Sequence, residues 1–327
     1  MVRTILKAVK KAALGSADVP QECTVGMPDP QQEIRIWLEG CGDPLDVTLN
    51  HVVACASPFT VGIGLNLERY EPNRRTGVLL RFQERNGGQR LLAKVALRPS
   101  ETVSATGQEL SLFQIRRCSN YCLPRHQIWA HDLHQALVRR RNDKNPEIPM
   151  SVRAARSMNV FFICPRPVVL VSVMHGDSGN IFPMNLFGGI GDGYFAFALN
   201  SRRKAAPLVE RTGRVALSSI PFEHAGLARK LGKNHRLEFA NWNELPFRTM
   251  PSAALGIPVP QFALRVREME IEAVRKLGSH TLFFARLIRD ERLSNDSQFC
   301  MVHGIYQAWR LRTFQERSQP FLNRAEV

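Results

Sequence analysis

The sequence is poor in acidic residues. Its 327 residues include 29 Asp and Glu against 44 Lys and Arg, which gives a formal net charge of +15 at pH 7. A field of this sign attracts nucleic acid, anionic lipid headgroups and phosphorylated small molecules. An ordinary solvated surface can carry the same surplus, so the charge does not choose among these functions.

Long apolar runs are also absent. No stretch of 18 uncharged apolar residues occurs, which excludes a membrane-spanning helix of the usual length. The longest apolar stretches, near Val160 and Val168, are interrupted by Pro165, Arg166 and Pro167. Hydrophobic residues make up 44% of the chain, which is enough for a folded protein rather than a disordered one. The length allows two domains with separate cores.

Cysteine is sparse and shows no pairing pattern. The seven cysteines are odd in number, scattered, and mostly surrounded by apolar residues. Small secreted domains that depend on disulfides usually carry an even set at regular spacing. We therefore expect reduced thiols and a cytoplasmic protein.

Residues 1–25 have the pattern of a basic amphipathic helix or tail. Apolar residues recur at helical spacing, with Lys and Arg on the other side of the helix. Such a segment suits an organellar transit peptide, a surface-binding helix, or a helix packed on the protein body. We favour the last of these.

Residues 26–145 are predicted to form a β-rich domain of unknown function that ends in a helix. Short strands at nearly regular spacing indicate an antiparallel sheet or a small barrel. Residues 33–117 contain no phosphate-binding loop, nucleophile elbow or paired carboxylates, so we expect a role in partner binding or dimerisation. The predicted strands are 34–38, 46–54, 60–67, 77–82, 90–97 and 110–115.

Residues 118–142 combine thiols and imidazoles with a helical apolar pattern. Zinc and iron bind these groups, but the C-x3-C spacing matches no standard finger. The pattern favours an amphipathic helix that begins near Pro124. Metal binding is left open, and no metal ligand is assigned. The residues concerned are Cys118, Cys122, His126, His131 and His134.

A linker is predicted at residues 142–149, which are polar and contain two prolines. We place the domain boundary there, with the second domain over 150–327. In that domain, strands are expected at 168–173, 194–199, 214–220, 263–273 and 280–293, and helices at 204–212 and 224–231. The Gly-rich segment 188–193 does not match G-x-G-x-x-G, which excludes a Rossmann reading. The basic residues from Arg310 onward are expected to be peripheral.

This second domain resembles the flavin reductase-like family, the FMN-binding split β-barrels. The resemblance rests on an ordered set of blocks rather than on one motif. It implies a mainly β fold with a few helices (α+β), in which a C-terminal FMN-binding split β-barrel follows a separate small antiparallel β domain ending in a helix. The blocks are PVVLVS at 167–172, GN at 179–180, MNL at 184–186, FALN at 197–200, LVERTG at 208–213, LGSHTLFFAR at 277–286 and GIY at 304–306.

The resemblance also implies the site residues. Asn200, Ser201, Arg202 and Lys204 would hold the FMN phosphate, since this cofactor group needs hydroxyls, amides and fixed positive charge. The segment Asn185, Leu186 and Phe187 would contact the flavin edge, and Ser219 stands at the place of a family Asn. His280 would lie near the nicotinamide or flavin face and position the hydride donor. A hydrogen-bonded strand residue without catalytic function is the competing interpretation of His280.

Two functions follow as hypotheses. The first is an FMN flavoprotein and homodimer that uses NADH or NADPH to pass hydride to FMN N5, and from there to a flavin, oxygen or protein acceptor. The alternative is a non-catalytic basic protein that binds nucleic acid or a protein partner and uses the split barrel to dimerise. The residues do not determine the electron acceptor, the choice of nicotinamide nucleotide, or whether FMN is a fixed or an exchanging ligand.

Overall fold

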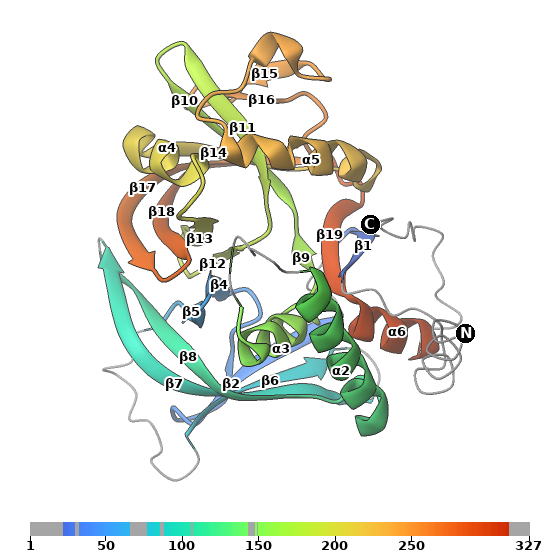
Figure 1. Cartoon of the computed structure of the whole chain (residues 1–327). Helices are drawn as coiled ribbons and strands as arrows, with labels where there is room; N and C mark the ends of the chain where they lie inside the picture. Colours follow the sequence, from blue (N-terminus) through green and yellow to red (C-terminus); the bar gives the residue numbers. More distant parts are fainter. Residues whose placement is uncertain are drawn as a thin grey trace, which may run out of the picture.

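The protein consists of two curled antiparallel sheets packed against each other, with helices packed on each sheet (Figure 1). The structure is a computed structural model, and it describes residues 22–29, 33–65, 77–85, 88–105, 107–142, 148 and 150–313. Residues 1–21 of the predicted N-terminal tail and most of the predicted linker lie outside these ranges. Residues 22–25, which we assigned to that tail, instead open the strand β1 (Glu22–Met27).

The N-terminal sheet has seven strands in the order β3-β2-β6-β7-β8-β5-β4. In β2 and β6 buried and half-buried residues alternate, as expected where one face of a sheet covers a core. The strands are β2 (Ile34–Glu39), β3 (Leu45–Asp46), β4 (His51–Ala56), β5 (Phe59–Ile63), β6 (Val78–Glu84), β7 (Leu91–Ala105) and β8 (Gln108–Asn120).

The predicted strand at 46–54 is wrong as a single element. Asp46 Oδ1 accepts hydrogen bonds from both the amide and the hydroxyl of Thr48. This local side-chain turn competes with strand pairing, and it separates β3 from β4. The loop between them carries Thr48 and Leu49 toward the other sheet.

The C-terminal sheet also has seven strands, in the order β11-β10-β14-β17-β18-β13-β12. Helix α4 (Ala205–Thr212) covers its inner face and ends at Gly213, whose φ of 65° is the left-handed conformation that glycine favours at a helix end. The strands are β10 (Val169–His175), β11 (Ser178–Met184), β12 (Phe187–Gly189), β13 (Tyr194–Asn200), β14 (Arg214–Ser219), β17 (Arg265–Leu277) and β18 (His280–Arg292).

A third sheet joins the two ends of the described chain. Its order is β1-β19-β9, where β9 is Arg166–Pro167 and β19 is Gln298–His303. Helix α6 (Gly304–Thr313) follows and buries Tyr306 and Trp309 in the core of the N-terminal sheet. The prediction that Arg310 is peripheral is wrong, because its guanidinium lies 2.7 Å from the Glu33 carboxylate.

Two further helices cover the N-terminal sheet. Helix α2 (Arg125–Asn142) begins just after Pro124, as predicted. Helix α3 (Val152–Phe161) was not predicted; it begins at Ser151, whose hydroxyl accepts a hydrogen bond from the Ala154 amide, a common N-cap. The remaining elements lie between β14 and β17: η2 (Phe222–His224), α5 (Ala225–Leu231), η3 (Gly232–Arg236), η4 (Trp242–Glu244), β15 (Thr249–Pro251) and β16 (Pro258–Pro260).

The two large sheets share an apolar contact, with β4 and β12 between them (Figure 1). The backbones approach closely at two glycines. A Cβ on Gly188 in β12 would lie 2.2 Å from the His51 carbonyl oxygen, and one on Gly64 would lie 2.1 Å from the Ile190 carbonyl oxygen. The buried cluster comprises Val52, Ala54, Leu110, Leu112, Ile190, Ala196, Ala198, Leu282 and Phe284.

The predicted fold class is confirmed: the protein is mainly β, and its C-terminal part is a curled half-barrel. The division into domains at residues 145–150 stays a prediction. Elements from beyond that boundary, α3, β19 and α6, contribute to the core of the N-terminal sheet. Within the described residues, no helix is long and apolar enough to cross a membrane.

Gly64→Ala tests the contact between the sheets. The new Cβ would meet the Ile190 backbone carbonyl at 2.1 Å and the Asn50 side-chain oxygen at 2.2 Å. Because the backbone contact cannot be relieved by a rotamer change, we expect the free energy of unfolding to fall by roughly 1–3 kcal/mol. Urea unfolding measures this change. Gly226→Ala in α5 is the matched control, since nothing lies within 4 Å of its added Cβ and alanine favours a helix. Equal stability of the two variants would contradict a tight contact.

Candidate functional site

A cavity of about 670 Å³ opens where the loop before β4 meets the C-terminal sheet. This volume is within the range of small-molecule and cofactor sites. Leu49 and His51 line it from the N-terminal sheet, and Phe187, Phe195 and Ser219 line it from the C-terminal sheet. The two sheets therefore build the cavity together.

Arginine dominates the charge of the cavity wall. Five arginines line it against two aspartates, Asp29 and Asp296. The uneven balance favours negative charge in the cavity, because a positively lined cleft of low dielectric concentrates anions. The arginines are Arg85, Arg166, Arg265, Arg267 and Arg292.

Arg166 is a buried cation bound to neutral acceptors. Its guanidinium donates to His51 Nε2 at 2.7 Å and to the Phe161 carbonyl oxygen at 3.3 Å. His51 Nδ1 lies 2.7 Å from the Val47 carbonyl, so Nδ1 carries the proton and Nε2 is free to accept. Burial, assisted by the Arg166 charge, lowers the pKa of His51 to about 3.

Arg265 and Arg267 share one carboxylate. Arg265 forms a bidentate pair with Asp290, and Arg267 Nε lies 3.4 Å from the same carboxylate. Burial and the neighbouring Arg265 lower the pKa of Arg267 to about 10. One negative charge against two positive charges leaves a surplus that an anionic ligand would neutralise.

Two half-buried phenylalanines form the apolar part of the wall. Phe187 and Phe195 are on the paired strands β12 and β13. The Arg267 guanidinium lies 5.5 Å from the centre of the Phe195 ring, within the range of a cation–π contact. The cavity therefore offers an aromatic surface directly beside fixed positive charge.

The structure brings only part of the predicted site into this cavity. Phe187 and Ser219 line it. Asn185 and Leu186 are absent from its lining; the Asn185 amide donates to Met301 Sδ at 3.4 Å, and Leu186 packs against the core clusters.

The predicted phosphate loop and His280 form a second group at the other end of β13. Asn200 pairs with His280 across β13 and β18. The Ser201 amide donates to the Ser279 carbonyl at 3.1 Å, and Asn200 Oδ1 accepts from the Arg202 amide. The loop leads through Lys204 into the N-terminus of α4. Asn200 lies five positions along β13 from Phe195 in the cavity, about 17 Å at ~3.4 Å per residue.

His280 is buried between the two sheets rather than in the cavity. Its Nδ1 lies 2.8 Å from Ser279 Oγ and 3.4 Å from the Ala56 amide, which donates to it. Burial lowers the pKa of His280 to about 4. A neutral imidazole held in this way can position neighbouring groups but is not a ready proton donor at neutral pH.

The comparisons with known proteins concern the C-terminal half of the chain. Residues 161–309 match the family model described as "Flavin reductase like domain". These residues form a flavin reductase like domain. No curated protein matches the chain.

Several solved structures are similar to part of the chain. An FMN-binding protein from Thermus thermophilus is 23% identical, with 39% of this chain and 71% of that chain covered and a TM-score of 0.36. An NADH:FAD oxidoreductase from Streptomyces globisporus is 17% identical, with coverages of 45% and 87% and a TM-score of 0.40. The styrene monooxygenase flavin reductase from Pseudomonas putida is 20% identical, with coverages of 45% and 93% and a TM-score of 0.37.

The flavin reductase like domain does not contain the whole cavity wall. Thr48, Leu49 and His51 lie outside the matched residues, and sequence reasoning did not find them. It also missed Arg265 and Arg267. The two arginines stand two positions apart at the start of a predicted strand. Since residues two apart in a strand share a face, this spacing was a signal that one face carries paired positive charge.

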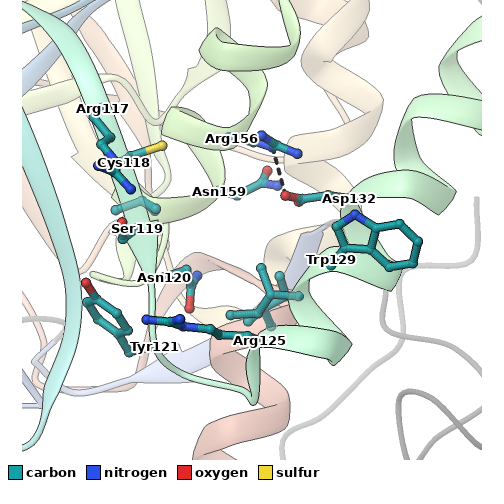
Figure 2. Close-up of a pocket in the computed structure, with 13 residues that line it drawn as sticks. Arg117, Cys118, Ser119, Asn120, Tyr121, Arg125, Trp129, Asp132, Arg156 and Asn159 are labelled. Atoms are coloured by element: carbon teal, nitrogen blue, oxygen red, sulfur yellow. Dashed lines mark ion pairs between the residues drawn. The ribbon is translucent and has the colours of Figure 1, made fainter.

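A smaller cavity of about 380 Å³ lies where β8, α2 and α3 meet (Figure 2). Asp132 and Arg156 form an ion pair on its wall, with Nε and Oδ2 2.8 Å apart. Cys118 is on its wall, whereas Cys122 is buried and His131 packs edge-on against His303. Among the described residues, no group of three or more His, Cys, Asp or Glu is placed to hold a metal ion.

His51→Gln tests the buried histidine. The unfolded chain binds more protons than the folded one between the folded pKa of about 3 and the unfolded value of ~6.5, so stability falls as pH drops through this window. Between pH 7.5 and 5 the loss from His51 is about 2 kcal/mol. The variant should lose that much less stability on acidification, measured by urea unfolding. His126 is exposed, so His126→Gln is the control and should lose as much stability on acidification as the wild type does. If His51→Gln also loses as much as the wild type, the attribution of the pH dependence to His51 is wrong.

Proposed function

We propose that the protein is an FMN-binding flavoprotein that uses NADH or NADPH to reduce its flavin. The observation that supports this best is the arginine-lined cavity with two aromatic side chains at the edge of the flavin reductase like domain. FMN demands both features, since its phosphate needs fixed positive charge and its ring needs an apolar surface. When bound, FMN supplies the hydride-accepting chemistry.

Each set of cavity residues has a role in this proposal. Arg166, Arg265 and Arg267 are the cations for the phosphate, because guanidinium groups bind it through charged, paired hydrogen bonds. Phe187 and Phe195 would contact the isoalloxazine ring. His51 keeps the Arg166 guanidinium in place through its Nε2 acceptor. Burial of the wall excludes water and strengthens these contacts.

The basic loop remains a second proposed position for the phosphate. Asn200, Ser201, Arg202 and Lys204 lie at the N-terminus of α4, where amides and the helix dipole favour an anion. Because this loop and the cavity lie at opposite ends of β13, substitutions in each place distinguish the two positions. His280 lies beside the loop and would position the nicotinamide donor rather than transfer a proton.

Other predictions of the sequence stay untested. They are the homodimer, a protein electron acceptor and the cytoplasmic location. The cytoplasmic prediction rested on reduced cysteines, and all seven cysteines are free thiols in the structure. The non-catalytic alternative has the net charge of +15 in its favour. Nucleic-acid affinity that falls steeply with salt, in a protein that retains no flavin, would support that alternative.

Arg267→Gln tests the cavity as the phosphate site. Loss of a charge-assisted hydrogen bond to phosphate should raise the Kd for FMN by about 10- to 100-fold. Flavin fluorescence quenching measures this. Arg289→Gln, an exposed arginine on β18, is the matched control and should bind FMN as wild type does.

The double variant Arg202→Ala/Lys204→Ala tests the loop in the same titration. If it loses FMN while Arg267→Gln binds normally, the phosphate belongs in the loop and the cavity assignment fails. If both variants bind normally, neither assignment stands.

Reduction by a nicotinamide nucleotide tests the enzymatic part of the proposal. We expect the FMN-loaded protein to be yellow and to lose its absorbance in the flavin bands when NADH or NADPH is added without oxygen. Stopped-flow absorbance gives the rate for each donor. A protein that binds FMN but is bleached by neither donor would be a flavin carrier rather than a reductase.

A further inference from the structure

The two large sheets have the same topology. With the seven strands of each sheet numbered in chain order, both sheets have the spatial order 2-1-5-6-7-4-3. Strands 1 and 2, 3 and 4, and 6 and 7 form antiparallel hairpins in both. Seven strands can be arranged in many ways, so an identical order with identical pairings indicates one fold repeated within the chain.

Side-chain orientation agrees with this correspondence. In the last hairpin of each sheet, Gln108 and His280 are the first residues of the returning strands. The third and fifth residues of these strands all lie in the apolar cluster between the sheets: Leu110 and Leu112 in β8, Leu282 and Phe284 in β18. The sixth residues, Phe113 and Ala285, instead enter the core of their own sheet.

The contacts between the sheets are reciprocal. The end of the β4–β5 hairpin meets the turn between β17 and β18, where the Ser279 amide donates to the Ser57 carbonyl at 2.8 Å. The end of the β12–β13 hairpin meets the start of β8, where Gln108 Nε2 lies 3.5 Å from Asp192 Oδ2. An exchange of this kind is characteristic of a two-fold interface between equal partners.

We propose that the chain is a pseudo-dimer of two split barrels, in which the N-terminal repeat occupies the place of a second subunit and completes the ligand cavity. Thr48, Leu49 and His51 of this repeat close the cavity of the C-terminal repeat. The site is therefore assembled within one chain. The identity of the ligand as FMN rests on the proposed function. The pairing of the two repeats is independent of that function.

The two repeats are not equivalent as binding sites. At the start of the sixth strand, the C-terminal repeat presents Arg265 and Arg267 to its cavity, whereas the N-terminal repeat has Leu92, Ala93 and Val95, all fully buried. Phe161 of α3 also packs against Phe59 and Phe82 inside the N-terminal repeat. The N-terminal repeat therefore has buried apolar side chains where the C-terminal repeat presents cations, so we expect one ligand per chain.

Mass and stoichiometry of the full-length protein test the proposal. Light scattering across a concentration series should give a monomer near 36.9 kDa, and an FMN titration should saturate at one per chain. A dimer, or two FMN per chain, would overturn it. If no FMN binds at any concentration, the proposed function fails, while the mass still decides the pseudo-dimer.

Mixing two variants decides whether the cavity is built within one chain. Leu49→Trp alters the N-terminal wall at an exposed position, and Arg267→Gln alters the C-terminal wall; each should bind FMN weakly. Mixed after partial unfolding and refolding, or coexpressed, they should still bind weakly. In a dimer with sites built across chains, about a quarter of the sites would regain both intact walls, and this recovery would overturn the proposal. Leu133→Trp on α2, exposed and outside the cavity, controls for the added tryptophan.

Discussion

The close contact of β4 with β12 is the constraint on which the rest of the structure depends. Only a residue without a side chain fits at Gly64 and Gly188, because backbone carbonyls of the other sheet occupy the space that a Cβ would need. This approach lets the intersheet cluster, built around Leu110 and Phe284, exclude water from both sheets at once. It also fixes the loop with Leu49 against the C-terminal sheet, where the cavity forms.

The buried arginines of the cavity lower the stability of the protein, because the surrounding residues do not fully neutralise their charge. Arg166 is buried among neutral acceptors, and Arg267, whose side chain is 14% exposed, has only a share of the Asp290 carboxylate. Desolvated cations destabilise a protein unless they are paired. Proteins keep such groups where function requires them, and an anionic ligand would supply the missing charge. This electrostatic imbalance is the physical basis of the proposal that the arginine cluster binds an anion.

Local sequence patterns predicted much of the fold. The strand and helix predictions from 168 to 231 agree with β10, β13, α4, β14 and α5, because apolar periodicity and turn residues act over a few positions. The elements that were missed owe their place to distant partners. Strand β1 pairs with β19 across most of the chain, and α6 is held by Tyr306 and Trp309 in the N-terminal core. Neither partner lies within a local window.

The sequence by itself determined the class of fold and a strong positive charge, because period and composition are local properties. The ordered sequence blocks from 167 to 306 added the resemblance of the C-terminal half to a family. Only the tertiary structure separated Phe187 and Ser219 from the Asn200 loop, which lies at the far end of β13. Only the tertiary structure brought His51 to Arg166, 115 positions away. Strand order and sheet packing decide which side chains share a cavity, and neither is encoded in the spacing of residues along the chain.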